Sequence, residues 1–166
     1  MQRLTDKEFN CPPYDGDRTY YIICSPPRTG SFLLCHLLTN SGVMGVPAEY
    51  FNPIFGWKFM AERLNLINNG KIDLTRYTNA LKILRTTPNG VFGVKMQYWM
   101  MGVLIQNKVF STHFPDLRFI FLTRRDKVAQ GVSFDIAQQT GMWTSQHPPS
   151  DQWATRPSQI ETLKYE

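Results

Sequence analysis

One uninterrupted apolar run constrains the fold of this chain more than any other feature. Residues 19–25 read TYYIICS, without the alternation of apolar and polar side chains that marks a strand with one solvated face. Strands that are covered on both faces have this pattern. Pro26 and Pro27 end the run, and residues 31–42 (SFLLCHLLTNSG) follow with helically spaced leucines and a glycine stop. The sequence therefore predicts a buried strand, a short loop and a helix.

Strands and helices continue to alternate along the chain. Strand patterns occur at 43–47, 91–97 and 117–123, of which the last is the clearest buried strand. Helical patterns occur at 55–70, at 73–87 and at 124–141, and in the apolar stretch that runs from the end of the strand at 91–97 to about residue 113. Buried strands that alternate with helices form a parallel sheet with helices on both faces. We therefore expect a three-layer α/β fold that binds ligands at the carboxyl ends of its strands.

Length and composition favour a single domain. The chain has 166 residues, 42% of them hydrophobic, and no linker, repeat or low-complexity tract divides it. Residues 1–18 form an irregular lead-in. Aliphatic residues are scarce beyond Gly141, and residues 158–166 begin a helical pattern with no cap at its end. We expect one domain over residues 1–166, truncated inside a helix at the C-terminus; a solvated, frayed terminus is the alternative.

The charged and sulfur-containing residues exclude several classes of protein. The net charge is +5, but most basic residues are scattered, whereas nucleic-acid binders gather them on one face. Cys11, Cys24 and Cys35 lack the spacing of a zinc site or a disulfide framework. No segment has the pattern of a signal peptide or a membrane span. We expect a cytoplasmic protein without a metal, a nucleic-acid partner or a membrane span.

The loop after the first strand has the composition of an anion site. Residues 26–31 (PPRTGS) lie where a helix begins, so backbone N–H groups lack intrahelical acceptors and the helix dipole is positive. Arg28 adds a permanent charge, and Gly30 lets the backbone approach a ligand closely. Thr29 and Ser31 carry hydroxyls that can donate hydrogen bonds. An ordinary strand-to-helix turn with a surface arginine is the alternative, because short glycine motifs occur by chance.

A second group of cations follows the strand expected at 117–123. Arg124 and Arg125 come directly after it, and Ser133 lies on the next helix. The sequence lacks GxxxxGK[ST] and a magnesium-binding carboxylate at a strand end, which disfavours a metal-dependent kinase of similar fold. Two anion sites at one sheet edge suit a donor with two anionic groups, such as PAPS (3′-phosphoadenosine 5′-phosphosulfate). A solvated helix start is the alternative for the two arginines.

Four blocks of the sequence carry a resemblance to a known family. They read YIICSPPRTGSFLLCHLL, GVPAEYF, PNGVFGVKM and FIFLTRRDKVAQGVSF, within residues 20–140. Their order and spacing resemble those of PAPS-dependent sulfotransferases, most closely the bacterial trehalose 2-sulfotransferase-like group. The resemblance implies a P-loop-like fold and metal-free transfer of a sulfuryl group from PAPS to a hydroxyl of a carbohydrate or related small molecule. Dimerisation also occurs in that family, and nothing else in the sequence establishes a homodimer.

The same resemblance implies roles for individual residues. The 5′-phosphosulfate loop maps to Arg28, Thr29, Gly30, Ser31 and Phe32, and the 3′-phosphate site maps to Arg124 and Ser133. Glu49 maps to the general base, Arg28 is the second catalytic residue, and Lys95 lies with Glu49 on the acceptor side. We expect burial among apolar neighbours to raise the pKa of Glu49 toward a value suited to taking a proton from a hydroxyl. A surface glutamate at a turn and an unremarkable strand-end lysine are the alternatives.

Two departures from the family pattern keep a second interpretation open. Pro26 and Pro27 stiffen a loop that usually carries more hydrogen-bonding residues. The chain also ends before the family's C-terminal segment, which completes the adenosine and 3′-phosphate pocket. The chain can therefore also be interpreted as an incomplete, non-catalytic relative that binds an adenine nucleotide or only a partner subunit.

Overall fold

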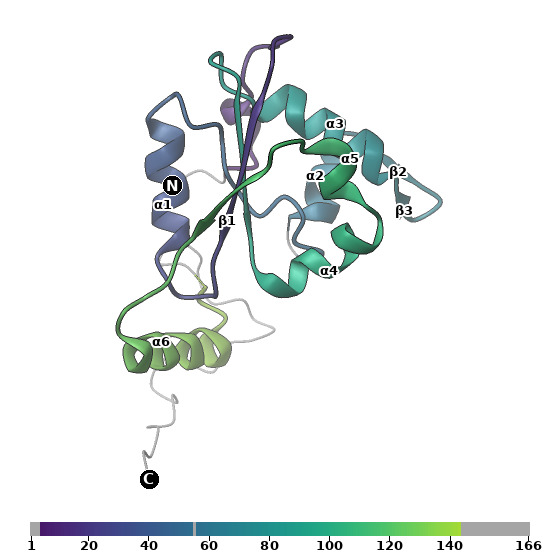
Figure 1. The fold of residues 1–166 in the computed structure, drawn as a ribbon. Helices are drawn as coiled ribbons and strands as arrows, with labels where there is room; N and C mark the ends of the chain where they lie inside the picture. The colour runs from purple at the N-terminus through teal and green to yellow at the C-terminus, as the bar shows by residue number, and fades with distance from the viewer. Residues whose placement is uncertain (1–3, 55, 144–166) are drawn as a thin grey trace.

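The computed structural model describes residues 4–54 and 56–143 (Figure 1). The elements are η1 (Lys7–Phe9), β1 (Thr19–Cys24), α1 (Ser31–Asn40), α2 (Trp57–Arg63), β2 (Ile67–Asn68), β3 (Lys71–Ile72), α3 (Leu74–Arg85), β4 (Val91–Met96), α4 (Tyr98–Gln106), α5 (Val109–His113), β5 (Arg118–Phe121) and α6 (Lys127–Thr140). Three strands form the main sheet in the order β4-β1-β5, and β2 pairs with β3 separately. Helix α1 lies on one side of this sheet and α2 to α5 on the other (Figure 1). The predicted three-layer α/β fold is confirmed.

The parallel register of β1 brings the carboxyl ends of all three strands to one edge. Cys24 at the end of β1 lies opposite Met96 in β4 and Phe121 in β5, and both pairings are parallel. The N–H of Leu122 extends the ladder by donating to the carbonyl of Cys24 at 2.9 Å. The loops that follow the three strands therefore start side by side at this edge.

Close packing along β4 requires two glycines. Gly93 lies opposite Tyr21 in β1, and a Cβ at Gly93 would overlap the Tyr21 ring. Gly45 has φ +70°, and a Cβ there would lie 2.9 Å from the backbone nitrogen of Gly93. The Tyr21 hydroxyl donates to the carbonyl of Met44 at 2.6 Å. The segment that leads to Glu49 is thereby held against β4.

The strand expected at 43–47 is not formed. The N–H of Gly45 donates to the hydroxyl oxygen of Thr87 at 3.1 Å, and the N–H of Val46 donates to the carbonyl of Arg85 at 3.3 Å. These acceptors belong to the end of α3 and the turn that follows, so no strand ladder can form. The left-handed backbone at Gly45 also interrupts an extended conformation.

The helix expected over 55–70 is shorter than its pattern indicated. It ends at Arg63, and β2 and β3 then form a hairpin around Asn69 and Gly70. These two residues have φ +48° and +71°, the conformation that an Asn-Gly hairpin turn requires. The Asn-Gly turn therefore determines the local structure here, and the helical spacing of the apolar residues does not. The helical pattern at 158–166 lies outside the described residues.

Strand β5 and two of the four leucines of α1 are more exposed than the sequence indicated. Phe119 and Phe121 are 61% and 77% exposed, although their strand has the clearest buried pattern in the sequence. Strand β5 is an edge of the described sheet and pairs only with β1. Leu33 and Leu37 are also exposed, and α1 turns Cys35 toward the core instead.

Replacement of Gly93 by Ala tests the close packing of β4. We expect Gly93→Ala to lower the free energy of unfolding by about 1–3 kcal/mol, because the added methyl group overlaps the Tyr21 ring. The control is Gly102→Ala in α4, where the added carbon has no described atom within 4 Å apart from its chain neighbours and the backbone of the same helix. That change should stabilise the protein by about 0.5–1 kcal/mol through helix propensity. Equal effects of the two substitutions in urea unfolding would contradict the packing.

Candidate functional site

The loop between β1 and α1 presents backbone N–H groups at the carboxyl edge of the sheet. Helix α1 begins at the buried Ser31, and Gly30 precedes it with a left-handed φ of +83°. The N–H of Leu34 donates to the carbonyl of Gly30 at 3.1 Å, which closes the first turn. The N–H groups before Leu34 have no intrahelical acceptor. Apart from Gly30 and its two chain neighbours, no described residue has an atom within 4 Å of the position that a Gly30 Cβ would take, so an anion has room there.

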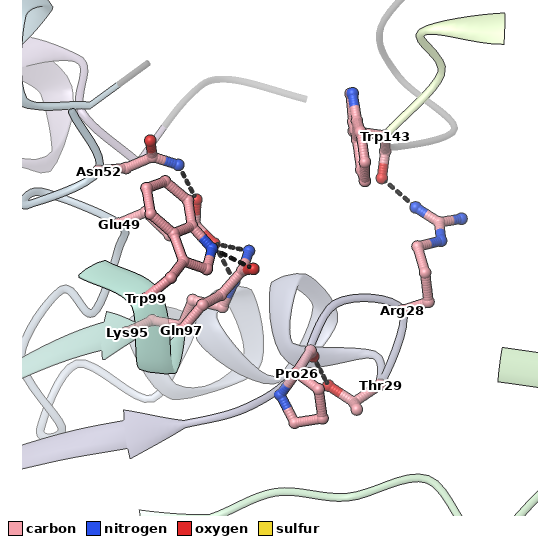
Figure 2. Close-up of polar contacts among 9 residues, drawn as sticks. All are labelled: Pro26, Arg28, Thr29, Glu49, Asn52, Lys95, Gln97, Trp99 and Trp143. Atoms are coloured by element: carbon pink, nitrogen blue, oxygen red, sulfur yellow. Dashed lines mark hydrogen bonds and ion pairs between the residues drawn. The ribbon is translucent and has the colours of Figure 1, made fainter. Parts of the chain in front are cut away.

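Arg28 connects this loop to α6. Its Nε donates to the hydroxyl oxygen of Ser133 at 2.9 Å. Its Nη1 donates to the carbonyl of Trp143 (Figure 2). Arg28 also adopts a left-handed φ of 64°, which costs a residue with a side chain about 1–2 kcal/mol. The predicted residues Arg28 and Ser133 are therefore in direct contact, although 105 positions separate them.

Arg124 lies close enough to Arg28 for the two charges to interact. Burial lowers the pKa of the Arg28 guanidinium, and the positive charge of Arg124 lowers it further. Within the described residues, neither arginine forms an ion pair with a carboxylate. Two guanidinium groups that repel each other are stabilised by an anion that binds both. We call Arg28, Arg124 and Ser133 the cationic cluster.

Two residues predicted for the same loop do not join the cationic cluster. The hydroxyl of Thr29 donates to the carbonyl of Pro26 at 3.1 Å, which closes the loop on itself. The ring of Phe32 packs edge-on against His36 with the centroids 4.5 Å apart. Thr29 thus shapes the loop, and Phe32 lies on the partly exposed face of α1.

A shallow pocket adjoins the loop on the α6 side. It has a volume of about 350 Å³, and its lining includes Pro26, Pro27 and Phe134. Gln130 also lines it, and the Gln130 Nε2 donates to the carbonyl of Pro27 at 2.8 Å. This bond holds α6 against the loop. The two prolines predicted to stiffen the loop thus form one wall of an apolar surface beside the cationic cluster.

Backbone contacts fix Glu49 beside β4. The N–H of Lys95 donates to the carbonyl of Ala48 at 3.0 Å, and the N–H of Asn52 donates to the carbonyl of Glu49 at 3.1 Å. A Cβ at Gly56 would overlap the carbonyl of Glu49, so only glycine allows this close approach. Lys95 is the last but one residue of β4, which places Glu49 at the same sheet edge as the loop of Arg28.

The carboxylate of Glu49 is surrounded by hydrogen-bond donors (Figure 2). Its Oε1 accepts from the ammonium of Lys95, with which it forms an ion pair, and from the Gln97 Nε2 at 3.2 Å. Its Oε2 accepts from the Asn52 Nδ2 at 2.6 Å. The side chains of Lys95 and Glu49 are 9% and 27% exposed, so the pair is partly shielded from water. The resemblance placed Lys95 on the acceptor side with Glu49, and in the structure the two side chains are in direct contact.

The expected rise in the pKa of Glu49 is wrong. Burial does raise it, but the charge of Lys95 and the hydrogen bonds from Lys95, Asn52 and Gln97 together hold it below the ordinary value of 4.5. Glu49 is therefore ionised at neutral pH, but its lowered pKa makes the carboxylate a weaker base than the raised pKa expected from the sequence. Because its pKa is lower in the folded than in the unfolded chain, the ionised group stabilises the fold above the unfolded pKa. This contribution is lost as the pH falls through the folded pKa.

Sequence reasoning missed four residues of this region. Asn52, Gln97 and Trp99 surround or support the carboxylate of Glu49, and the carbonyl of Trp143 accepts from Arg28. Gln97 and Trp99 directly follow β4, so the rule that ligands bind at the carboxyl ends of parallel strands could have identified them. Nothing in the local sequence signals the contact of Trp143.

Comparison with known proteins identifies the family of this chain. The model of the family described as Stf0 sulphotransferase matches residues 20–166. The chain belongs to the Stf0 sulphotransferase family. The resemblance seen in the four sequence blocks is therefore confirmed at the level of the family.

Two curated relatives from mycobacteria match most of the chain. The trehalose 2-sulfotransferase of Mycolicibacterium smegmatis is 27% identical over an alignment of 166 residues, which covers 79% of this chain and 61% of that protein. The trehalose 2-sulfotransferase of Mycobacterium tuberculosis is 29% identical over 163 residues, which covers 77% of this chain and 60% of that protein. The chain thus spans about three-fifths of the length of these two relatives.

Residues 4–54 and 56–143 lack two further kinds of feature. No helix there is both long and apolar enough to cross a bilayer. Those residues also contain no group of three or more His, Cys, Asp or Glu side chains arranged to hold a metal ion.

Removal of the Lys95 charge tests what holds the pKa of Glu49 down. We expect Lys95→Met to raise this pKa, because burial then opposes ionisation without the neighbouring ammonium. The measurement is a pH titration of carbon-13-labelled glutamate carboxyl groups by NMR. The control is Lys58→Met, since Lys58 pairs with Glu62 at the exposed surface of α2. An unchanged or lower pKa of Glu49 in Lys95→Met would show that groups other than Lys95 keep this pKa below its ordinary value.

Proposed function

We propose that this chain transfers a sulfuryl group from PAPS to a hydroxyl of a carbohydrate. The observation that carries the proposal is the ionised Glu49 at the same sheet edge as the cationic cluster, in a chain of the Stf0 sulphotransferase family. An ionised carboxylate can take a proton from a hydroxyl, and a cationic cluster can hold an anionic donor. Both are needed for transfer of an anionic group to an alcohol.

The residues around the loop fit PAPS as the donor. Its phosphosulfate end suits Arg28 and the first N–H groups of α1, and its 3′-phosphate suits Arg124 and Ser133. The pocket beside Pro27 and Phe134 offers apolar surface to the adenine ring. When bound, PAPS supplies the sulfuryl group and a phosphate that leaves with a negative charge.

The roles of the residues follow from their charges and contacts. Glu49 accepts the proton of the attacking hydroxyl, and its hydrogen bonds to Asn52 and Gln97 fix the direction of its carboxylate. Lys95 keeps Glu49 ionised. Arg28 and the N–H groups of the loop stabilise the negative charge that grows on the donor side, as preorganised donors do in other transfer reactions.

The names of the relatives support a sugar as the acceptor. Both are called trehalose 2-sulfotransferase, which describes transfer to one hydroxyl of a disaccharide. We propose a carbohydrate for this chain on that basis. The single domain, the homodimer, the cytoplasmic location and the lack of a nucleic-acid partner remain predictions from the sequence.

A second candidate function is nucleotide binding without catalysis. Arg28 already donates to the Trp143 carbonyl and to Ser133, so a donor must displace at least one of these contacts or bind around them. The chain also spans about three-fifths of the curated relatives. Binding of PAP, the desulfated product, without transfer to any sugar would support this candidate.

Substitution of Glu49 tests the catalytic assignment. We expect Glu49→Gln to reduce transfer of labelled sulfate from PAPS to trehalose by at least about 100-fold, because the amide cannot accept the proton. The affinity for PAP in calorimetry should stay within about twofold, since no donor contact is removed. A fully active Glu49→Gln protein would remove Glu49 from the mechanism.

Substitution of the arginines tests the cationic cluster. Arg28→Ala should weaken PAP binding by at least about tenfold and also slow the transfer. The variant lacks the guanidinium that binds the phosphate of the nucleotide and that stabilises the negative charge formed during the transfer. Arg124→Ala should weaken PAP binding to a similar degree. The control is Arg76→Ala, which removes an equal charge from the exposed surface of α3. Equal PAP affinities in all three variants would show that the nucleotide binds elsewhere.

A further inference from the structure

Trp99 links the protein surface to the carboxylate of Glu49 through one amide group. It lies in the first turn of α4, directly after β4, and 49% of its surface is exposed. Its Nε1–H donates to the Oε1 of Gln97 at 2.9 Å, and the Nε2 of Gln97 donates to Glu49. Figure 2 shows the indole alongside the side chains of Gln97 and Glu49. A half-exposed indole is thus held beside the carboxylate.

The packing of the core does not account for this indole. A tryptophan stabilises a fold mainly by burying its large apolar surface, and half of that surface is left in water here. The one polar atom of the ring is already bonded to Gln97. The surface that the indole offers to solvent is therefore apolar. An apolar aromatic surface next to a few fixed polar groups is the composition of a small-molecule site.

We infer that Trp99 forms the acceptor subsite, with its indole against the apolar face of a sugar ring. This inference rests on the proposed function and adds the residue that selects and orients the acceptor. A sugar ring presents C–H groups on its faces and hydroxyls around its rim. A ring lying on the indole directs one rim hydroxyl toward the carboxylate of Glu49, where its proton is taken.

Trp99 also positions the amide of Gln97. The indole N–H can only donate, so it binds the oxygen of the Gln97 amide and turns the NH₂ group toward Glu49. The opposite orientation would set the amide oxygen against a carboxylate oxygen. Loss of the indole N–H therefore frees the Gln97 amide to rotate and removes one hydrogen-bond donor from Glu49. The aromatic face of Trp99, which contacts the sugar, does not depend on this N–H.

Three variants separate the two roles in transfer of labelled sulfate from PAPS to trehalose. Trp99→Ala should raise KM for trehalose at least about tenfold, because the platform is lost. Trp99→Phe keeps an aromatic face but lacks the N–H. It should leave KM for trehalose within about threefold of the wild-type value. It should also shift the acid limb of the dependence of kcat on pH to higher pH, because Glu49 loses a hydrogen-bond donor. Gln97→Leu should reproduce this pH shift without a change in KM.

Tyr98→Ala is the matched control, because Tyr98 is the neighbouring aromatic residue of α4 and is 90% exposed. It should leave KM and the pH profile unchanged. PAP affinity, measured by calorimetry, should stay constant in every variant and shows that each is folded. An active wild-type chain whose KM for trehalose is the same in Trp99→Ala overturns this inference alone. A wild-type chain that binds PAP but sulfates no sugar overturns the proposed function and this inference with it.

Discussion

The parallel pairing of β1 with both β4 and β5 is the constraint on which the rest of the structure depends. It brings three strand ends to one edge, so that the loop of Arg28, the Lys95–Glu49 pair and the segment carrying Arg124 meet there. Residues more than 100 positions apart in sequence thus form one region, as the bond between Arg28 and Ser133 shows. Parallel strands require helical crossovers, and these supply the helix starts at which anions bind.

Charge divides this edge into two regions with different properties. The cationic cluster holds two arginines whose repulsion favours a bound anion. The region around Glu49 is compensated internally, since Lys95 pairs with the carboxylate and two amides complete its hydrogen bonds. The carboxylate has a cationic partner, whereas the arginines of the cationic cluster have no carboxylate partner within residues 4–54 and 56–143. This arrangement suits a reaction in which an anionic group moves to a neutral hydroxyl. In the proposed reaction, the cluster holds the donor and Glu49 receives the proton.

The sequence allowed the fold to be predicted where local patterns and tertiary contacts agree. The strands β1 and β4 and the helix α3 follow from their residue patterns, and the side chain of Asp73 caps α3 by accepting from the N–H of Arg76 at 3.0 Å. The strand at 43–47 was predicted wrongly because side-chain and helix-end acceptors take its hydrogen bonds. The pKa of Glu49 was predicted wrongly because burial is visible in an apolar pattern, whereas Lys95, Asn52 and Gln97 converge only in three dimensions.

The most direct test of this account is a crystal structure of the full chain with PAP and trehalose. The account predicts phosphate groups against Arg28 and Arg124, and a trehalose hydroxyl within hydrogen-bond distance of the Glu49 carboxylate. PAP bound away from both arginines, or a sugar whose hydroxyls all lie far from Glu49, would contradict it.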